Sequence, residues 1–128
     1  MKVIYSAVFL DRPLPGRLTT VIANQHVTHV FRPSTVDKSF LGKKVAVKLL
    51  GYANDGVNEG YSVSVSSADE NLHEALKSIL VPHITLSVSE SGKPVDTQKL
   101  DFKPVDKCET IIGSYGVFCD DGRVHFEL

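Results

Sequence analysis

Short hydrophobic runs and polar turn segments alternate along the first part of the chain. Residues 3–10 are rich in β-branched and aromatic side chains, which is typical of a buried strand. Residues 11–16 include two prolines and a glycine and therefore interrupt any regular element. Residues 17–24 carry hydrophobic side chains at positions i, i+3 and i+4, and this spacing predicts a short helix. The stretch 26–31 predicts the next strand.

The same order of elements returns in the middle of the chain. Residues 43–52 predict a strand, and the turn-forming segment 54–60 separates it from residues 61–67, which alternate between serine and valine and predict another strand. Hydrophobic positions then switch to helical spacing over residues 70–80, until a proline ends the predicted helix. Residues 83–89 alternate again and predict a further strand.

Both regions run strand, helix, strand, which suggests a repeated unit. The first half covers about residues 1–35 and the second about residues 43–90. In the C-terminal section, about 110–128, residues 111–119 and 123–127 predict a hairpin closed by an Asp-Asp-Gly turn. We therefore predict a single α+β domain that spans all 128 residues. It is expected to be bilobal, with two pseudo-symmetric strand–helix–strand halves, mostly antiparallel sheets and a C-terminal β-hairpin.

The composition is that of an ordinary globular protein, with 42% hydrophobic and 23% charged residues. The formal net charge of -1 excludes a large basic excess, so we do not expect the protein to bind long duplex nucleic acid by charge. The apolar start of the chain is short for a signal-peptide core and too short to span a bilayer. Two cysteines, Cys108 and Cys119, are too few for a disulfide framework. These features predict a cytoplasmic protein that does not bind membranes.

Two matching triplets open two of the predicted strands. His26-Val27-Thr28 begins one strand, and His83-Ile84-Thr85 begins the other, 57 residues later. A single His-x-Thr triplet is a weak signal, but chance seldom places two of them at the starts of matching strands. Because residues i and i+2 of a strand point to the same face, each histidine projects beside its threonine, and Val27 and Ile84 face the core.

If the two strands lie side by side, two imidazoles and two hydroxyls converge on one cleft. This arrangement suits metal-independent hydrolysis of a phosphodiester, in which a neutral histidine takes a proton from water and a protonated one donates a proton to the leaving oxygen. The hydroxyls of Thr28 and Thr85 would hold the non-bridging phosphate oxygens. The unperturbed pKa of histidine, ~6.5, permits both protonation states, so His26 and His83 each fit either role.

The two triplets resemble the paired His-hydrophobic-Thr signatures of the two-histidine (2H) phosphoesterase superfamily. This superfamily includes the 2′,3′-cyclic phosphodiesterases of RNA repair, bacterial 2′-5′ RNA ligase-like proteins and viral enzymes that cleave nucleotide second messengers. The resemblance covers about residues 3–90. It implies a bilobal α+β fold, metal-independent chemistry and a site made of His26, His83, Thr28 and Thr85.

Three other residues bear on the site. Tyr5 and Tyr61 occupy similar places in the two repeats, where each could either stack on a nucleobase or pack in the interior. His29 should lie on the opposite face of its strand from His26, which favours a structural role and argues against a shared zinc site. We therefore expect no metal ion and no cofactor.

These observations predict a hydrolase that acts on a cyclic or 2′-linked nucleotide phosphodiester, such as an RNA 2′,3′-cyclic phosphate end or a cyclic (oligo)nucleotide signal. Its expected partner is a small nucleotide or a single RNA end. The alternative is a binding module that keeps the cleft and holds a nucleotide or an RNA end without turnover. A third hypothesis is a structural or partner-binding domain in which the paired motif is accidental.

Overall fold

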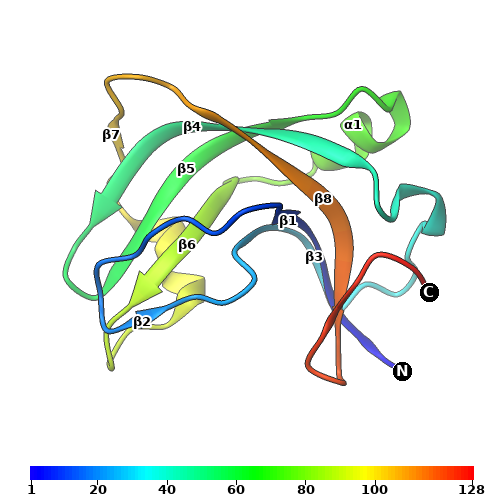
Figure 1. Cartoon of the computed structure of the whole chain (residues 1–128), viewed down its shortest axis with the longest axis horizontal. Helices are drawn as coiled ribbons and strands as arrows, with labels where there is room; N and C mark the ends of the chain where they lie inside the picture. The colour runs from blue at the N-terminus through cyan, green and yellow to red at the C-terminus, as the bar shows by residue number, and fades with distance from the viewer.

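The computed structural model describes residues 1–128 and shows an α+β fold dominated by one sheet (Figure 1). Its short helices are η1 (Lys38–Phe40), α1 (Glu70–Leu76) and η2 (Pro94–Lys99), of which η1 and η2 are 3₁₀ helices. The strands are β1 (Val3–Leu10), β2 (Thr20–Val21), β3 (His26–Phe31), β4 (Lys44–Asn54), β5 (Asn58–Ser66), β6 (His83–Val88), β7 (Lys103–Pro104), β8 (Thr110–Cys119) and β9 (Val124–His125). The predicted α+β class and mostly antiparallel pairing are confirmed.

The order of the strands brings distant parts of the chain together. The sheet has nine strands in the order β2-β6-β5-β4-β8-β1-β3, with β7 beside β4 and β9 beside β8. The long strands β4 and β8 pair in the middle of this order and join the group β2, β6 and β5 to the group β1 and β3 (Figure 1). Strands β3 and β6 lie toward opposite ends of the order and nevertheless contact each other, so the sheet curls back on itself.

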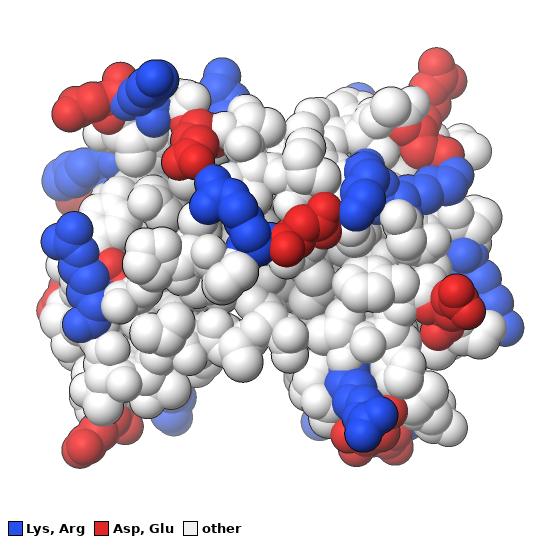
Figure 2. All heavy atoms as spheres, in the orientation of Figure 1, with Lys and Arg blue, Asp and Glu red and all other residues white.

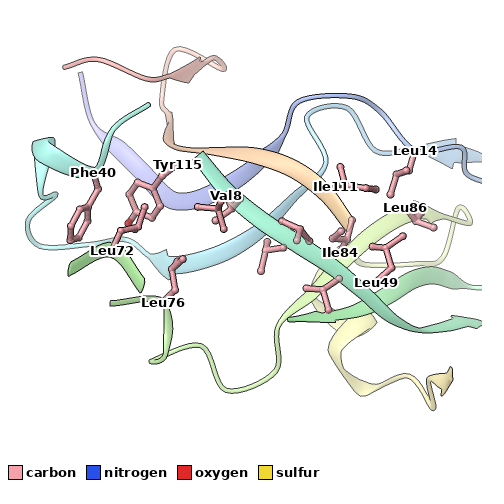
Figure 3. Close-up of a cluster of buried hydrophobic side chains, with 14 residues drawn as sticks. Val8, Leu14, Phe40, Leu49, Leu72, Leu76, Ile84, Leu86, Ile111 and Tyr115 are labelled. Carbon is pink, nitrogen blue, oxygen red and sulfur yellow. The ribbon is translucent and has the colours of Figure 1, made fainter. Parts of the chain in front are cut away.

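One face of the curled sheet forms the hydrophobic core (Figure 3). Fourteen buried residues make up this cluster. Two of them, Leu72 and Leu76, belong to α1, and the others come from the strands, from η1 and from a loop. Val27 of β3 and Ile84 of β6 are both 0% exposed. This confirms the prediction that the middle residue of each His-x-Thr triplet faces the core, and it leaves the histidines and threonines on the other face.

The prediction of a helix over residues 17–24 is wrong. This segment contains no helix, and its residues Thr20 and Val21 form β2, which pairs with Val88 and Ser87 of β6. A helix this short is marginal by itself, and its threonines favour extended backbone. Pairing with the open edge of β6 satisfies the backbone groups instead, so the first half of the chain does not run strand, helix, strand.

Two other predicted elements are shorter than expected. Helix α1 ends at Leu76 rather than near residue 80, and Leu80 is 95% exposed. The predicted strand 123–127 is reduced to β9, which pairs with Val117 and Phe118 of β8. None of the helices has the length and hydrophobicity that a membrane-spanning helix requires.

Candidate functional site

The histidines and threonines of the two triplets lie in one cleft. His26 and Thr28 from β3 line the same cavity as His83 and Thr85 from β6, and its volume is about 760 Å³. This volume is within the range of ~300–1,000 Å³ that is typical of sites for a single small ligand. Residues 57 positions apart in the sequence are thus brought together where β3 and β6 meet.

The two histidine rings are held in the same way. Nδ1 of His26 lies 2.8 Å from the carbonyl oxygen of Asn24, and Nδ1 of His83 lies 2.8 Å from the carbonyl oxygen of Val81. In each case the carbonyl belongs to the residue two positions earlier. Because a carbonyl oxygen only accepts, Nδ1 carries the hydrogen, and Nε2 of the neutral ring keeps its lone pair. Each Nε2 can therefore take a proton and, once protonated, donate it.

His26 has an aromatic environment that favours its neutral form. Its ring centroid lies 4.8 Å from that of Tyr5, in a stacked arrangement, and 5.5 Å from that of Phe9. Burial lowers the pKa of His26, the bond to the Asn24 carbonyl partly offsets this, and the charge of His83 lowers the pKa further. His26 is therefore suited to act as a base at neutral pH.

The two threonine hydroxyls of the cleft differ in their contacts. Oγ1 of Thr85 lies 3.1 Å from the carbonyl oxygen of Pro94 and 2.9 Å from Oγ1 of Thr97, both in η2. The Asn58 amide in turn donates to Oγ1 of Thr97 over 3.0 Å. Thr28 lines the cleft from β3. A phosphate held by both hydroxyls would therefore have to replace the contact between Thr85 and Pro94.

The two tyrosines named from the sequence lie in different places. Tyr5 lines the cleft beside His26. Tyr61 does not line it, because it stands opposite Ile84 in the pairing of β5 with β6 and so shares the core-facing side of the sheet. Its ring lies 5.4 Å from that of Tyr52, in a second pocket on that side.

Two phenylalanines that were not predicted from the sequence also line the cleft. In the pairing of β1 with β3, Tyr5 stands opposite Phe31, Ser6 opposite Val30 and Ala7 opposite Thr28, so His29 is an extra residue in a β-bulge. The bulge shifts the alternation by one position and brings Phe31 to the cleft side. Phe118 reaches the same cleft from β8, where it stands opposite Tyr5. Neither the bulge nor the β1–β8 register leaves a local sequence signal.

A buried glutamate anchors the segment that leads to His26. Glu59 is 1% exposed and accepts hydrogen bonds from the backbone N–H of Arg17 (2.9 Å), from the Ser87 hydroxyl (2.7 Å) and from the Tyr52 hydroxyl. Burial by itself raises the pKa of Glu59, but these hydrogen bonds outweigh it and hold the pKa below its usual value. Through Arg17 and Ser87, Glu59 thereby links the segment 14–25 to β6, and this segment includes Asn24, whose carbonyl orients His26.

The structure contains no group of three or more His, Cys, Asp or Glu side chains placed to hold a metal ion. Comparison of the chain with protein-family models, with curated proteins and with solved structures finds no match.

Proposed function

We propose that this protein hydrolyses a cyclic or 2′-linked nucleotide phosphodiester by acid–base catalysis between two histidines. The observation that supports this most directly is the matched orientation of His26 and His83. Both rings donate Nδ1–H to the carbonyl two residues earlier, and both leave Nε2 available in one cleft. A pair of imidazoles with the same tautomer can divide the roles of base and acid.

In the proposed reaction His26 is the base. Its Nε2 takes a proton from a water molecule as the water oxygen bonds to phosphorus, and the bond from phosphorus to the leaving ribose oxygen breaks. Protonated His83 gives its Nε2 proton to that oxygen, so the products are a phosphomonoester and a free ribose hydroxyl. Thr28 donates its hydroxyl hydrogen to a non-bridging oxygen, and Thr85 does the same once its contact with Pro94 is released.

The test is a panel of 2′,3′-cyclic nucleotides, cyclic dinucleotides and 2′-5′ linked oligonucleotides, with products separated chromatographically. We expect turnover that persists in EDTA and that falls at least ~100-fold in His26→Ala and in His83→Ala, since general acid–base catalysis contributes ~10²–10⁴ in rate. His125→Ala, a histidine outside the cleft, is the control, and circular dichroism checks that each variant is folded. Turnover that persists in both single variants, His26→Ala and His83→Ala, would contradict the proposal.

The proposal extends to the architecture and the compartment. We infer a pseudo-twofold, bilobal relation between the region around β1 and β3 and the region around β5 and β6. The matching bonds of His26 and His83 support it, although residues 17–24 form the short strand β2 and loops in place of a helix.

We also propose that the protein acts in the cytoplasm, where its thiols at Cys108 and Cys119 would stay reduced.

A nucleotide-binding module without turnover is the second candidate, and the contact between Thr85 and Pro94 favours it. A hydroxyl already bonded to a carbonyl is a poorer phosphate donor than a free one. This candidate predicts that a nucleotide raises the melting temperature of the protein and is recovered unchanged. Consumption of the nucleotide contradicts it.

A further inference from the structure

The cleft that contains the two histidines is lined without any Lys, Arg, Asp or Glu side chain. Besides the histidines and threonines of the two triplets, its wall includes Tyr5, Phe31, Phe118, Val95, Asn24 and Gln98. The chain as a whole is not poor in charge, with 14 basic and 15 acidic residues. Figure 2 shows both signs scattered over the visible face, without a continuous basic surface. The lack of fixed charge is therefore a property of the cleft.

This lack of charge limits the ligand that the cleft can hold. A phosphate charge taken out of water needs a cation or several hydrogen-bond donors to compensate it. Among the residues that line the cleft, apart from two hydroxyls and neutral amides, only a protonated imidazole offers a positive charge, and burial favours the neutral form of His26. The Arg32 guanidinium does not line the cleft and lies over the ring of Phe31. One imidazolium balances one negative charge. A phosphodiester carries one charge, whereas a phosphomonoester carries about -1.5 to -2 near neutral pH.

The rest of the wall is suited to a nucleobase. The ring of Tyr5 is stacked with those of His26 and Phe118, with centroids 4.8 Å and 5.3 Å away, so Phe118 and Phe31 are the rings of this wall on which a base can stack. Phe31 stands opposite Tyr5 in the sheet and is 63% exposed. The Arg32 guanidinium lies 5.2 Å from the centroid of its ring, so a base stacks on the ring face that Arg32 does not cover. Stacking on such rings does not require charge on the base.

We infer that the ligand is a mononucleoside cyclic phosphate, with its single phosphodiester charge at the histidines and its base on the wall of Tyr5, Phe31 and Phe118. The nucleotide part of this inference rests on the proposed function, whereas the limit of one charge rests on the lining of the cleft. Nucleotides with a second phosphate, such as 5′-phosphorylated cyclic nucleotides and cyclic dinucleotides, should bind poorly. The dianionic product of hydrolysis should also leave readily.

The experiment compares a nucleoside 2′,3′-cyclic phosphate with the same compound carrying a 5′-phosphate, and with a cyclic dinucleotide. Turnover is measured with the natural compounds, and binding is measured by calorimetry with the cyclic phosphorothioates, which have the same charge and resist hydrolysis. We expect the singly charged ligand to bind at least ~10-fold more tightly than either of the others. Its Kd should change less than about twofold between about 50 mM and about 300 mM salt.

The outcomes separate the two proposals. Tighter binding of either of the more highly charged nucleotides, or no binding of any of the three, overturns the inference. Turnover with the opposite charge preference would overturn it while leaving the proposed hydrolysis intact. Selective binding of the singly charged ligand without turnover supports the inference and contradicts the hydrolase.

Substitutions at one exposed position test the charge limit directly. Val95 lines the cleft and is 63% exposed, so its replacement should leave the fold intact. We expect Val95→Lys to bind the 5′-phosphorylated nucleotide at least about fivefold more tightly than Val95→Gln at low salt, and to lose this gain at high salt. Equal affinities of the two variants at low salt would contradict the inference.

A second pair of variants tests the aromatic wall. Phe31→Ala should weaken binding of the singly charged nucleotide roughly 5- to 150-fold, the equivalent of one base stack. Val95→Ala is the matched control, because both residues are 63% exposed and line the same cleft, but only Phe31 is aromatic. Equal losses in the two variants would show that the base does not stack on Phe31.

Discussion

His29 differs from the two cleft histidines because both of its ring nitrogens are bonded. Nε2 lies 3.0 Å from the carbonyl oxygen of Ala75 and must carry the hydrogen, so Nδ1, 2.6 Å from the Tyr115 hydroxyl, accepts from that hydroxyl. Burial lowers the pKa of His29, and the bond to Ala75 only partly offsets this. One residue after Thr28, the same residue type thus has a structural role, linking β3 to α1 and β8.

The pKa of His29 leads to a prediction for stability against pH. Because this pKa is lower in the folded protein than the ordinary ~6.5, the unfolded chain binds more protons below that pH, and the free energy of unfolding falls as the pH decreases. Urea unfolding should therefore show a smaller loss of stability between about pH 7 and about pH 5 for His29→Leu than for the parent chain. Both chains contain His26, whose lowered pKa contributes a similar loss to each, so the difference between them reports on His29. Equal losses in parent and variant would contradict the role of His29.

At the scale of elements, η2 packs closely against β5 and β6 on the cleft side of the sheet. Gly60 of β5 permits this approach, because a Cβ there would lie 2.4 Å from the carbonyl oxygen of Ile84 and 2.5 Å from Cγ2 of Thr97. Thr97 is fully buried and hydrogen-bonded to Thr85. The glycine thus determines how η2 contacts a threonine of the candidate site.

Gly60→Ala should force this packing apart. Since the clash involves backbone as well as a side chain, we expect a loss of about 1–3 kcal/mol in the free energy of unfolding, measured in urea. Amide hydrogen exchange should accelerate in η2. Ser62→Ala, two residues along the same strand and only half-buried, is the control. Unchanged exchange in η2 would show that the helix does not depend on this contact.

At the scale of the whole molecule, the candidate site exists only because the curled sheet brings β3 to β6. The two strands are not paired with each other in the sheet. Strand β3 is hydrogen-bonded to β1, and β6 is hydrogen-bonded to β5. The buried Glu59 adds a further connection, since it ties residues 14–25 to β6 immediately before the chain enters β3. The distance between the histidines is therefore a property of the complete fold.

This proximity predicts an electrostatic coupling between the histidines. The positive charge of His83 lowers the pKa of His26, so His83→Ala should raise that pKa. Titration of the His26 ring by NMR measures the shift, and His73→Ala, a histidine on α1, serves as the control. A His26 pKa that is the same in His83→Ala and in the parent would mean that the two rings do not share a cleft in solution.

Much of the local structure was predictable from the sequence. The bounds of β1 and β3 agree with the predicted ranges 3–10 and 26–31, because runs of β-branched and aromatic residues favour extended backbone. The burial of Val27 and Ile84 followed from strand alternation. The helix over 17–24 failed because an edge strand of the sheet was available to pair with that segment, which hydrophobic spacing does not reveal.

The sequence by itself determined where most strands run and that each histidine shares a face with its threonine, since both depend on backbone geometry over a few residues. Only the tertiary structure decided which side chains surround them. A bulge at His29 brought Phe31 into the cleft, β8 supplied Phe118, and the register of β5 turned Tyr61 away. These outcomes depend on pairing between strands far apart in the chain, and so does the uncharged cleft at the meeting of β3 and β6. No local pattern of residues records such pairings.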